Sequence, residues 1–134
     1  MEISATVASS PGAHRAVVRT NTTEHEIVVA AKPSGGSATN GGEFLMLALA
    51  TCYCNDLYRE AARLGLQLDA VKVEASADFD GIGLAASRVS YSATVTSPAS
   101  ADAIARLLRE TDAVAEVHNT LRQGVDVRLI ETST

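Results

Sequence analysis

Hydrophobic and polar residues alternate along two segments in the middle of the chain. Apolar residues occupy every second position from Val71 to Phe79 and again from Val89 to Val95, with charged or hydroxylated residues between them. A period of two is typical of β-strands that bury one face. The connecting residues 80–83, Asp-Gly-Ile-Gly, favour a turn, so we predict an antiparallel hairpin. Shorter strands are predicted upstream, at Ile3–Val7, Arg15–Arg19 and His25–Ala31.

A long helix is predicted from Glu43 to Leu64. Asn40 is a good N-terminal cap, and Glu43 stands three residues later, which is the spacing of a capping box. Gly65 follows the last helical residue and favours a stop there.

The first three turns of this helix have no polar face, because nearly every residue from Phe44 to Cys54 is apolar. Such a helix has to be buried all round, and one sheet of a short chain covers only one side of it. A second copy of the chain is the simplest cover for the other side, so we expect an intertwined homodimer with this helix at its centre. Beyond Asn55 the helix becomes amphipathic, and its charged residues are expected to face water: Asp56, Arg59, Glu60 and Arg63.

Two further helices and a last strand are predicted downstream. Ser100 caps a helix that carries apolar residues on one face, and a third helix starts at Asp112 and ends at Gly124. Val125, Val127 and Leu129 then alternate as a final strand. The predicted order is β-β-β-α-β-β-α-α-β, an α+β fold in a single domain over residues 1–134.

Composition and charge exclude several classes of protein. The chain has 134 residues, 23 of them alanine, and a formal net charge of −5, so we expect no nucleic-acid partner, which requires a basic face. The opening ten residues lack the pattern of a signal peptide. The longest apolar run, Phe44–Ala50, is far shorter than the roughly 20 residues of a membrane span. We expect a cytoplasmic protein with no membrane partner.

The cysteines and histidines give no metal-binding pattern. Cys52 and Cys54 are the only cysteines, too few for a disulfide framework or a four-cysteine zinc site. Two residues apart on a helix, they point in different directions and are not expected to form a disulfide with each other. His14, His25 and His118 are not at ligand spacing, and a surface or hydrogen-bonding role is predicted for each. No metal is expected.

Two glycine patterns resemble nucleotide-binding motifs but lack their context. Gly81–Ala86 matches G-x-G-x-x-A, yet a predicted strand follows it where the motif needs a helix. Gly36–Gly41 has the glycine spacing of a P-loop, but Gly42-Glu43 stands where Lys and Ser or Thr are needed. We therefore predict no cofactor.

The start of the long helix resembles a known family signature. Residues 43–52 read Glu-Phe-Leu-Met-Leu-Ala-Leu-Ala-Thr-Cys, which is similar to the signature E-L-L-L-A-A-L-A-x-C of the OsmC/Ohr family. That family comprises osmotically inducible and organic hydroperoxide resistance proteins. The resemblance extends to Gly35-Gly36, to Thr39-Asn40 and to Val117–Leu121, so it covers nearly the whole chain.

The resemblance implies an OsmC-like fold, in which antiparallel sheets wrap around a buried central helix, and two active sites at the interface of an intertwined homodimer. It implies that Cys52 is the thiolate that attacks the peroxide, becomes a sulfenic acid and is restored by an external thiol reductant. A guanidinium would lower the pKa of this thiol, and Arg15 falls nearest the family's catalytic arginine, with Arg19 as the other candidate. Glu43 would orient that arginine, or serve only as the helix cap.

One departure from the family leaves two functions open. Where the family carries a second, resolving cysteine, this chain has Ala115-Glu116. The first function is a one-Cys, thiol-dependent peroxidase that reduces small organic hydroperoxides in defence against oxidative stress. The second is a non-catalytic OsmC-like dimer that binds a small apolar ligand in the same interface pocket.

Overall fold

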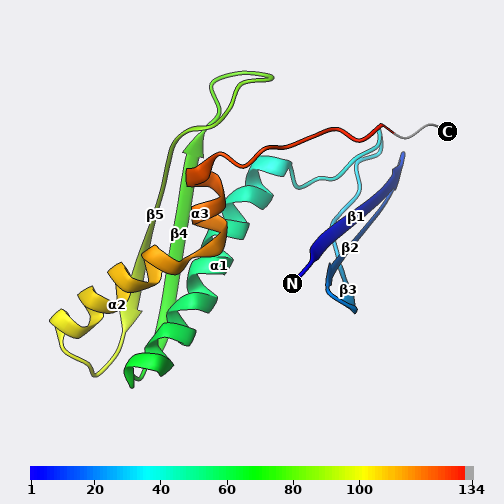
Figure 1. Ribbon diagram of the computed structural model, residues 1–134. Coiled ribbons are helices and arrows are strands. Elements are labelled where there is room, and N and C mark those ends of the chain that lie inside the picture. The colour runs from blue at the N-terminus through cyan, green and yellow to red at the C-terminus, as the bar shows by residue number, and fades with distance from the viewer. Residues whose placement is uncertain (132–134) are drawn as a thin grey trace. The chain divides into compact units, whose positions relative to one another are not determined.

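Three strands at the start of the chain are followed by a long helix, a hairpin and two shorter helices (Figure 1). The structure is a computed structural model and describes residues 1–131. The chain divides into two units, the first ending at Phe44 and the second beginning at Leu45. Each unit is described by itself. The mixed helix and strand content confirms the predicted α+β class.

The first unit contains an antiparallel meander of β1 (Ile3–Ser10), β2 (Ala13–Thr20) and β3 (Thr23–Ile27). These strands confirm the three predicted ones, but β3 ends at Ile27 and does not reach Ala31. Residues of the loop that follows form backbone hydrogen bonds with one another instead. Ala31 forms an isolated bridge with Ser37, and the Lys32 amide donates to the Gly36 carbonyl at 3.0 Å. These groups are therefore not available to extend the ladder with β2.

Helix α1 (Gly41–Leu64) begins with the predicted capping box. The Glu43 amide donates to Oδ1 of Asn40 at 2.8 Å, and the Asn40 amide donates to Oε1 of Glu43 at 3.0 Å. At the other end Gly65 has a φ of 69°, the left-handed conformation that glycine adopts without strain. The Leu66 amide then donates to the Ala61 carbonyl at 2.8 Å, which closes the helix.

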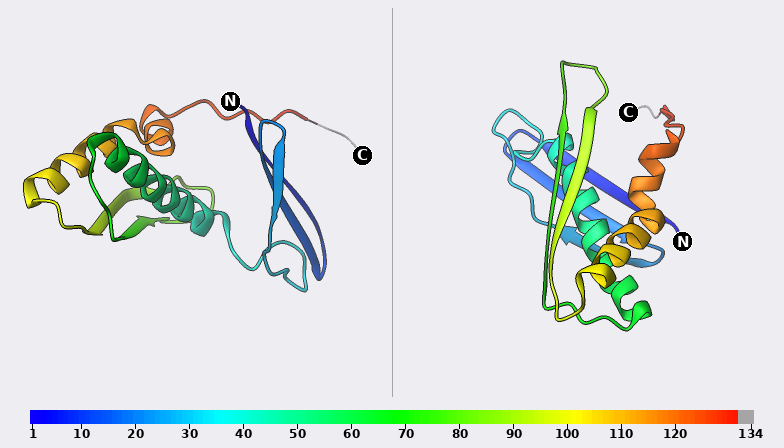
Figure 2. Two further views of the ribbon diagram at one scale, coloured as in Figure 1. Left: turned by 90° about the horizontal axis from the view of Figure 1, so that it is seen from below. Right: turned by 90° about the vertical axis from the view of Figure 1, so that its left-hand side faces the viewer.

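The predicted hairpin is formed by β4 (Ala70–Asp78) and β5 (Ser87–Thr96), which lie alongside α1 (Figures 1 and 2). Along β4 the half-buried and exposed residues alternate, as the sequence pattern predicts. The core lies between this face and the helices. It is centred on Tyr53, Leu57 and Ala61 of α1 and on Leu107 of α2 (Ala101–Val114). Each large side chain buried there contributes about 1.5–3 kcal/mol of hydrophobic free energy.

The apolar first half of α1 is only partly covered by its own chain. Leu49 and Tyr53 face the core with 2% and 3% of their surface exposed, whereas Leu47 is 59% exposed. The expectation that a second copy covers the remaining face stays a prediction.

The prediction for the second half of α1 was wrong at two positions. Asp56 and Glu60 do not face water, because only 5% and 8% of their surface is exposed. Arg59 and Arg63 lie over them: Arg59 pairs with Asp56 at 3.0 Å and Arg63 pairs with Glu60 at 3.0 Å. The long arginine side chains thus remain exposed and cover the shorter carboxylates.

Helix α2 begins as predicted, since the Ser100 hydroxyl accepts from the Ala103 amide at 3.2 Å. The predicted start of the third helix at Asp112 was wrong. Helix α2 continues to Val114, Ala115 is extended, and α3 (Glu116–Gln123) follows. The break is stabilised by α3, because the Asn119 side chain donates to the carbonyl of Ala113 at 3.0 Å. Gly124, with a φ of 60°, ends α3 as predicted.

The predicted final strand was also wrong. Residues 125–131 have no regular secondary structure, and Val125, Val127 and Leu129 are 56%, 93% and 87% exposed. A strand needs the backbone of a neighbouring strand for its hydrogen bonds. Within the part of the chain that the structure describes, no strand pairs with this segment.

Candidate active site around Cys52

Cys52 lies on α1 where the helix passes the first turn of α3. Its thiol is free and partly exposed. The sulfur is 3.6 Å from Oδ2 of Asp56, one turn further along α1, and 3.9 Å from Oε2 of Glu116, the first residue of α3. The thiol can therefore donate its single hydrogen to either of two carboxylates, from residues 4 and 64 positions away in the sequence.

The N-terminus of α3 acts in the opposite direction on this thiol. The backbone of Val117, in the first turn of α3, lowers the pKa of Cys52. The first amides of a helix have no partner inside the helix and carry the positive end of its dipole. The arrangement therefore offers a thiolate one of the features that activates reactive cysteines.

The guanidinium of Arg59 pairs with each of the carboxylates around this site. Nη1 of Arg59 is 3.0 Å from Asp56 and 3.4 Å from Glu116, and its Nε is 3.4 Å from Glu60. Asp56 and Glu116, the two carboxylates beside the thiol, thus share one cation, whereas Glu60 also pairs with Arg63. Negative charge is in excess next to the thiol.

The net result is a thiol held in its protonated form. Burial raises the pKa of Cys52 above its ordinary value, and the negative charges of Asp56 and Glu116 raise it further. Burial also raises the pKa of Asp56, with Glu116 adding to the effect. The pKa of Glu116 is lowered, because the carboxylate accepts from its own backbone amide and lies beside Arg59. A lowered thiol pKa at Cys52 therefore needs a further cation.

Cys52, Asp56 and Glu116 are also a group that could hold a metal ion. One ligand atom from each lies within 4.8 Å of the others. The guanidinium of Arg59 already bridges the two carboxylates, so an ion would have to displace it. The geometry favours an ion-paired cluster.

The predicted arginines and Glu43 lie in the first unit. Arg15 is 3.8 Å from the carboxylate of Glu26, and Arg19 binds Glu24 more closely, at 2.9 Å. The Glu43 carboxylate is engaged in the capping box with Asn40. The assignment of Arg15, Arg19 and Glu43 to the Cys52 site stays a prediction.

Cys54 remains a free thiol, in agreement with its position two residues from Cys52. The prediction for His118 was wrong, since it has neither a surface position nor a hydrogen bond. Its ring is 3% exposed, and among residues 1–131 neither ring nitrogen has a hydrogen-bond partner. It packs edge-on against Tyr91, with ring centroids 4.4 Å apart.

A second polar group lies beside His118. The Tyr91 hydroxyl donates to the carboxylate of Asp112, and Nη2 of Arg122 donates to the same carboxylate at 2.7 Å. These two bonds lower the pKa of Asp112. The pKa of Tyr91 is raised, first by burial and then by its hydrogen bond to Asp112 and the charge of that carboxylate. We call these three residues the Tyr91 network.

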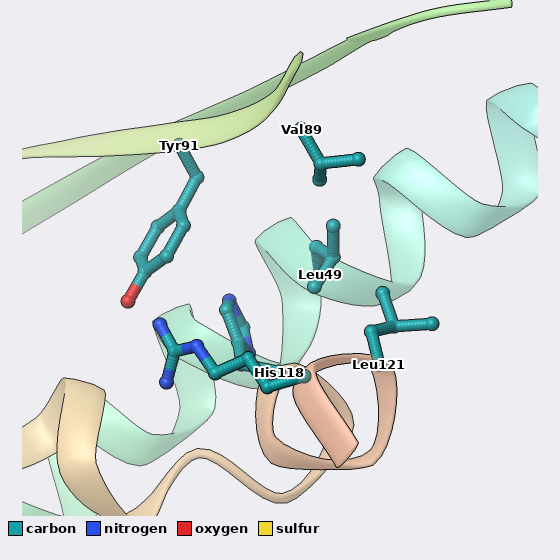
Figure 3. A pocket seen from close by; sticks show the side chains of 6 residues that line it. Leu49, Val89, Tyr91, His118 and Leu121 are labelled. Atoms are coloured by element: carbon teal, nitrogen blue, oxygen red, sulfur yellow. The ribbon is translucent and has the colours of Figure 1, made fainter. Parts of the chain in front are cut away.

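A cavity of about 230 Å³ opens between α1, β5 and α3 (Figure 3). Apolar side chains form one part of its wall, and Tyr91 and His118 form another. Its lining residues are Leu49, Val89, Tyr91, His118, Leu121 and Arg122. Cys52 is not among them.

The sequence interpretation missed two neighbours of Cys52. Asp56 could have been found, because residues four apart on a helix lie on the same face. Glu116 gave no such signal, since its contact with Cys52 depends on how α3 packs on α1.

Comparisons with known proteins give the family. The sequence model of the OsmC-like protein family matches residues 34–130, which is most of the chain. The chain belongs to the OsmC-like protein family. No curated protein matches the chain.

Solved structures of OsmC-like proteins share the fold. An OsmC-like protein of Mycoplasma pneumoniae is 14% identical with a TM-score of 0.62, over 90% of this chain and 86% of that one. An OsmC-like hydroperoxide resistance protein of Jannaschia sp. CCS1 is 14% identical with a TM-score of 0.60, over 97% and 91%. An organic hydroperoxide resistance protein of Legionella pneumophila is 15% identical with a TM-score of 0.61, over 96% and 94%. At this identity the likeness shows the fold. Among the described residues, no helix is long and apolar enough to cross a membrane.

Proposed function

We propose that this OsmC-like chain is a thiol-dependent peroxidase that reduces small organic hydroperoxides through Cys52. The observation that carries the proposal is the position of the Cys52 sulfur beside Glu116, the first residue of α3, where the Val117 backbone lowers the pKa of the thiol. Family membership and the hydroperoxide resistance proteins among the similar structures support it.

The reaction needs no metal or organic cofactor. The Cys52 thiolate attacks the outer oxygen of the hydroperoxide, an S–O bond forms and the O–O bond breaks. The leaving alkoxide takes a proton and departs as an alcohol, and the sulfur becomes a sulfenic acid. A thiol reductant then attacks that sulfur, releasing water and forming a mixed disulfide. A second reductant thiol frees Cys52 and leaves as part of a disulfide.

The cation that the thiolate lacks is assigned to Arg15 as part of the same proposal. Arg15 holds its carboxylate partner at 3.8 Å, whereas Arg19 binds its own at 2.9 Å. The looser pair is easier to break, which favours Arg15 as the residue that approaches Cys52. Glu43 would orient it while also capping α1. The homodimer with its site at the interface, the single domain over residues 1–134 and the cytoplasmic location belong to this proposal.

The carboxylates beside the thiol favour a second candidate. Asp56 and Glu116 raise the pKa of Cys52, which suits an OsmC-like dimer that binds a small apolar ligand in the interface pocket without catalysis.

A peroxide assay separates the two candidates. Purified protein is given cumene hydroperoxide and dihydrolipoamide, and the loss of peroxide is followed. Wild type and Cys54→Ser are expected to turn over, and Cys52→Ser is expected to be inactive. Absence of turnover by wild type, or equal turnover by Cys52→Ser, would exclude the peroxidase. Light scattering that finds a folded monomer would exclude the dimer.

A further inference from the structure

The cavity between α1, β5 and α3 is separate from the cysteine site. Cys52 does not line it, and the thiol-side residues Asp56 and Glu116 do not either. Its volume of about 230 Å³ lies below the roughly 300–1,000 Å³ of pockets for drug-sized ligands. An occupant has to be a small molecule.

His118 is the polar group in this wall that lacks a partner. The side chain is 97% buried, and among the described residues neither ring nitrogen makes a hydrogen bond. Burial, together with the charge of Arg122, lowers its pKa. The ring is therefore neutral at pH 7, with one donor and one acceptor nitrogen. A buried polar group without a partner costs about 1–3 kcal/mol. Neither nitrogen is accessible to solvent, so an outside partner gains this free energy only when a neighbouring side chain moves aside.

The charge in the wall is already balanced. Arg122 is the one charged residue among those that line the cavity, and it donates to the Asp112 carboxylate at 2.7 Å. The Tyr91 hydroxyl donates to the same carboxylate. A charged ligand would have to break this network, whereas a neutral ligand would leave it intact.

The remaining wall is apolar. Leu49, Val89 and Leu121 line it from three different elements, and Figure 3 shows them gathered away from Tyr91. We propose that this cavity binds a small neutral molecule that has an apolar body and one hydroxyl-type group, with the body against these three side chains and the polar group hydrogen-bonded to His118. The proposal does not depend on catalysis by Cys52.

Binding is tested by NMR on the ¹⁵N-labelled full chain with phenol as the probe. Phenol carries an apolar ring and one hydroxyl; toluene lacks the hydroxyl and benzoate adds a charge. Phenol is expected to give saturable shifts centred on the amides of Leu49, Val89 and Leu121. It is also expected to shift the ring nitrogens of His118, and toluene and benzoate are expected to bind at least about fivefold more weakly.

The variants identify the group that recognises the hydroxyl. His118→Phe keeps a ring against Tyr91 but removes both nitrogens, and it is expected to weaken phenol about five- to tenfold, the effect of one hydrogen bond. The matched control is His25→Phe, at an exposed histidine of β3, which should leave phenol binding unchanged.

Three results would overturn the proposal. Absence of saturable shifts at the cavity means that water or protein satisfies His118. Equal affinity for phenol and toluene, or unchanged affinity in His118→Phe, means that the imidazole does not recognise the ligand. If His118→Phe does not fold, the response of the wild-type ring nitrogens to phenol against toluene still decides between these outcomes.

Discussion

The two ends of α3 show how differently a carboxylate behaves when its partners change. At the N-terminal end, Asp56 and Glu116 lie beside the Cys52 thiol and share the guanidinium of Arg59. Near the C-terminal end of α3, Arg122 donates to the carboxylate of Asp112 on α2, and the Tyr91 hydroxyl donates to the same carboxylate. The pKa of Asp56 is raised and that of Asp112 is lowered.

The difference lies in the ratio of donors to carboxylates. Asp112 has two donors to itself, and each of them stabilises its charged form. Asp56 is more deeply buried, faces a second carboxylate and shares its cation, so both desolvation and repulsion favour its neutral form. These acidic groups also raise the pKa of Cys52. A catalytic role for this thiol therefore requires another group that stabilises the thiolate.

The largest expected effect comes from removing the acidic groups beside the thiol. In a Cys54→Ser background, where only Cys52 reports, Asp56→Asn with Glu116→Gln is expected to lower the pKa of Cys52. A decrease of one pKa unit raises the thiolate fraction at pH 7 about tenfold. Iodoacetamide reacts with the thiolate, so the rate at which it alkylates Cys52, followed by intact mass, measures this change in the thiolate fraction.

The control for that experiment is Glu110→Gln, which removes a carboxylate that pairs with Arg63 and Arg106 and makes no contact with Cys52. It should leave the alkylation rate unchanged. If the double variant reacts no faster than wild type, burial alone raises the pKa of Cys52. The claim that Asp56 and Glu116 raise it would then be contradicted.

A smaller effect is expected from breaking the Tyr91 network. Arg122 donates to the Asp112 carboxylate at 2.7 Å and to the Asp112 backbone carbonyl at 3.2 Å, so it also caps the end of α2. Because this pair is partly exposed, Arg122→Met is expected to lower the free energy of unfolding by about 1 kcal/mol. Urea unfolding of the variant and of wild type measures this loss of stability.

Arg128→Met is the matched control, since Arg128 pairs with Asp126 at the same distance of 2.7 Å but is 82% exposed. It should change stability by less than about 0.5 kcal/mol. Equal losses in the two variants would show that the Tyr91 network adds nothing beyond a surface ion pair.

The smallest effects are in the pH dependence of stability, and they have opposite signs. Asp112 has a lowered pKa when folded, so its contribution is present above the ordinary carboxyl pKa and is lost as the pH falls through the folded value. Asp56 has a raised pKa, so its contribution is present in acid and is lost as the pH rises through the folded value.

Urea unfolding between pH 3 and 7 compares Asp112→Asn and Asp56→Asn with wild type. Asp112→Asn is expected to lose more stability at pH 7 than at pH 3. Asp56→Asn, which keeps a neutral side chain at every pH, is expected to become more favourable relative to wild type as the pH rises. The same sign in both variants would contradict the assigned pKa directions.

Local sequence patterns predicted most of the secondary structure. Alternation at period two predicted the β4–β5 hairpin, and Asn40, Gly65 and Ser100 marked helix ends, because strand faces and caps depend on residues a few positions apart. The same local patterns predicted a helix start at Asp112 and a strand after Gly124, and both were wrong. Each depends on a distant partner: Asn119 stabilises the break at Ala115, and a strand needs another strand beside it.

The sequence alone indicated the family, because its signature lies in one continuous helical stretch, and the family match over residues 34–130 confirms it. The role of Cys52 as the reactive residue stays a prediction. Only the tertiary structure brought Glu116 to the thiol and buried His118 beside Tyr91. It also covered Asp56 with Arg59, although both had been expected to face water. A residue's type follows from the sequence, but its pKa and its free hydrogen-bonding capacity are set by neighbours that packing brings from elsewhere in the chain.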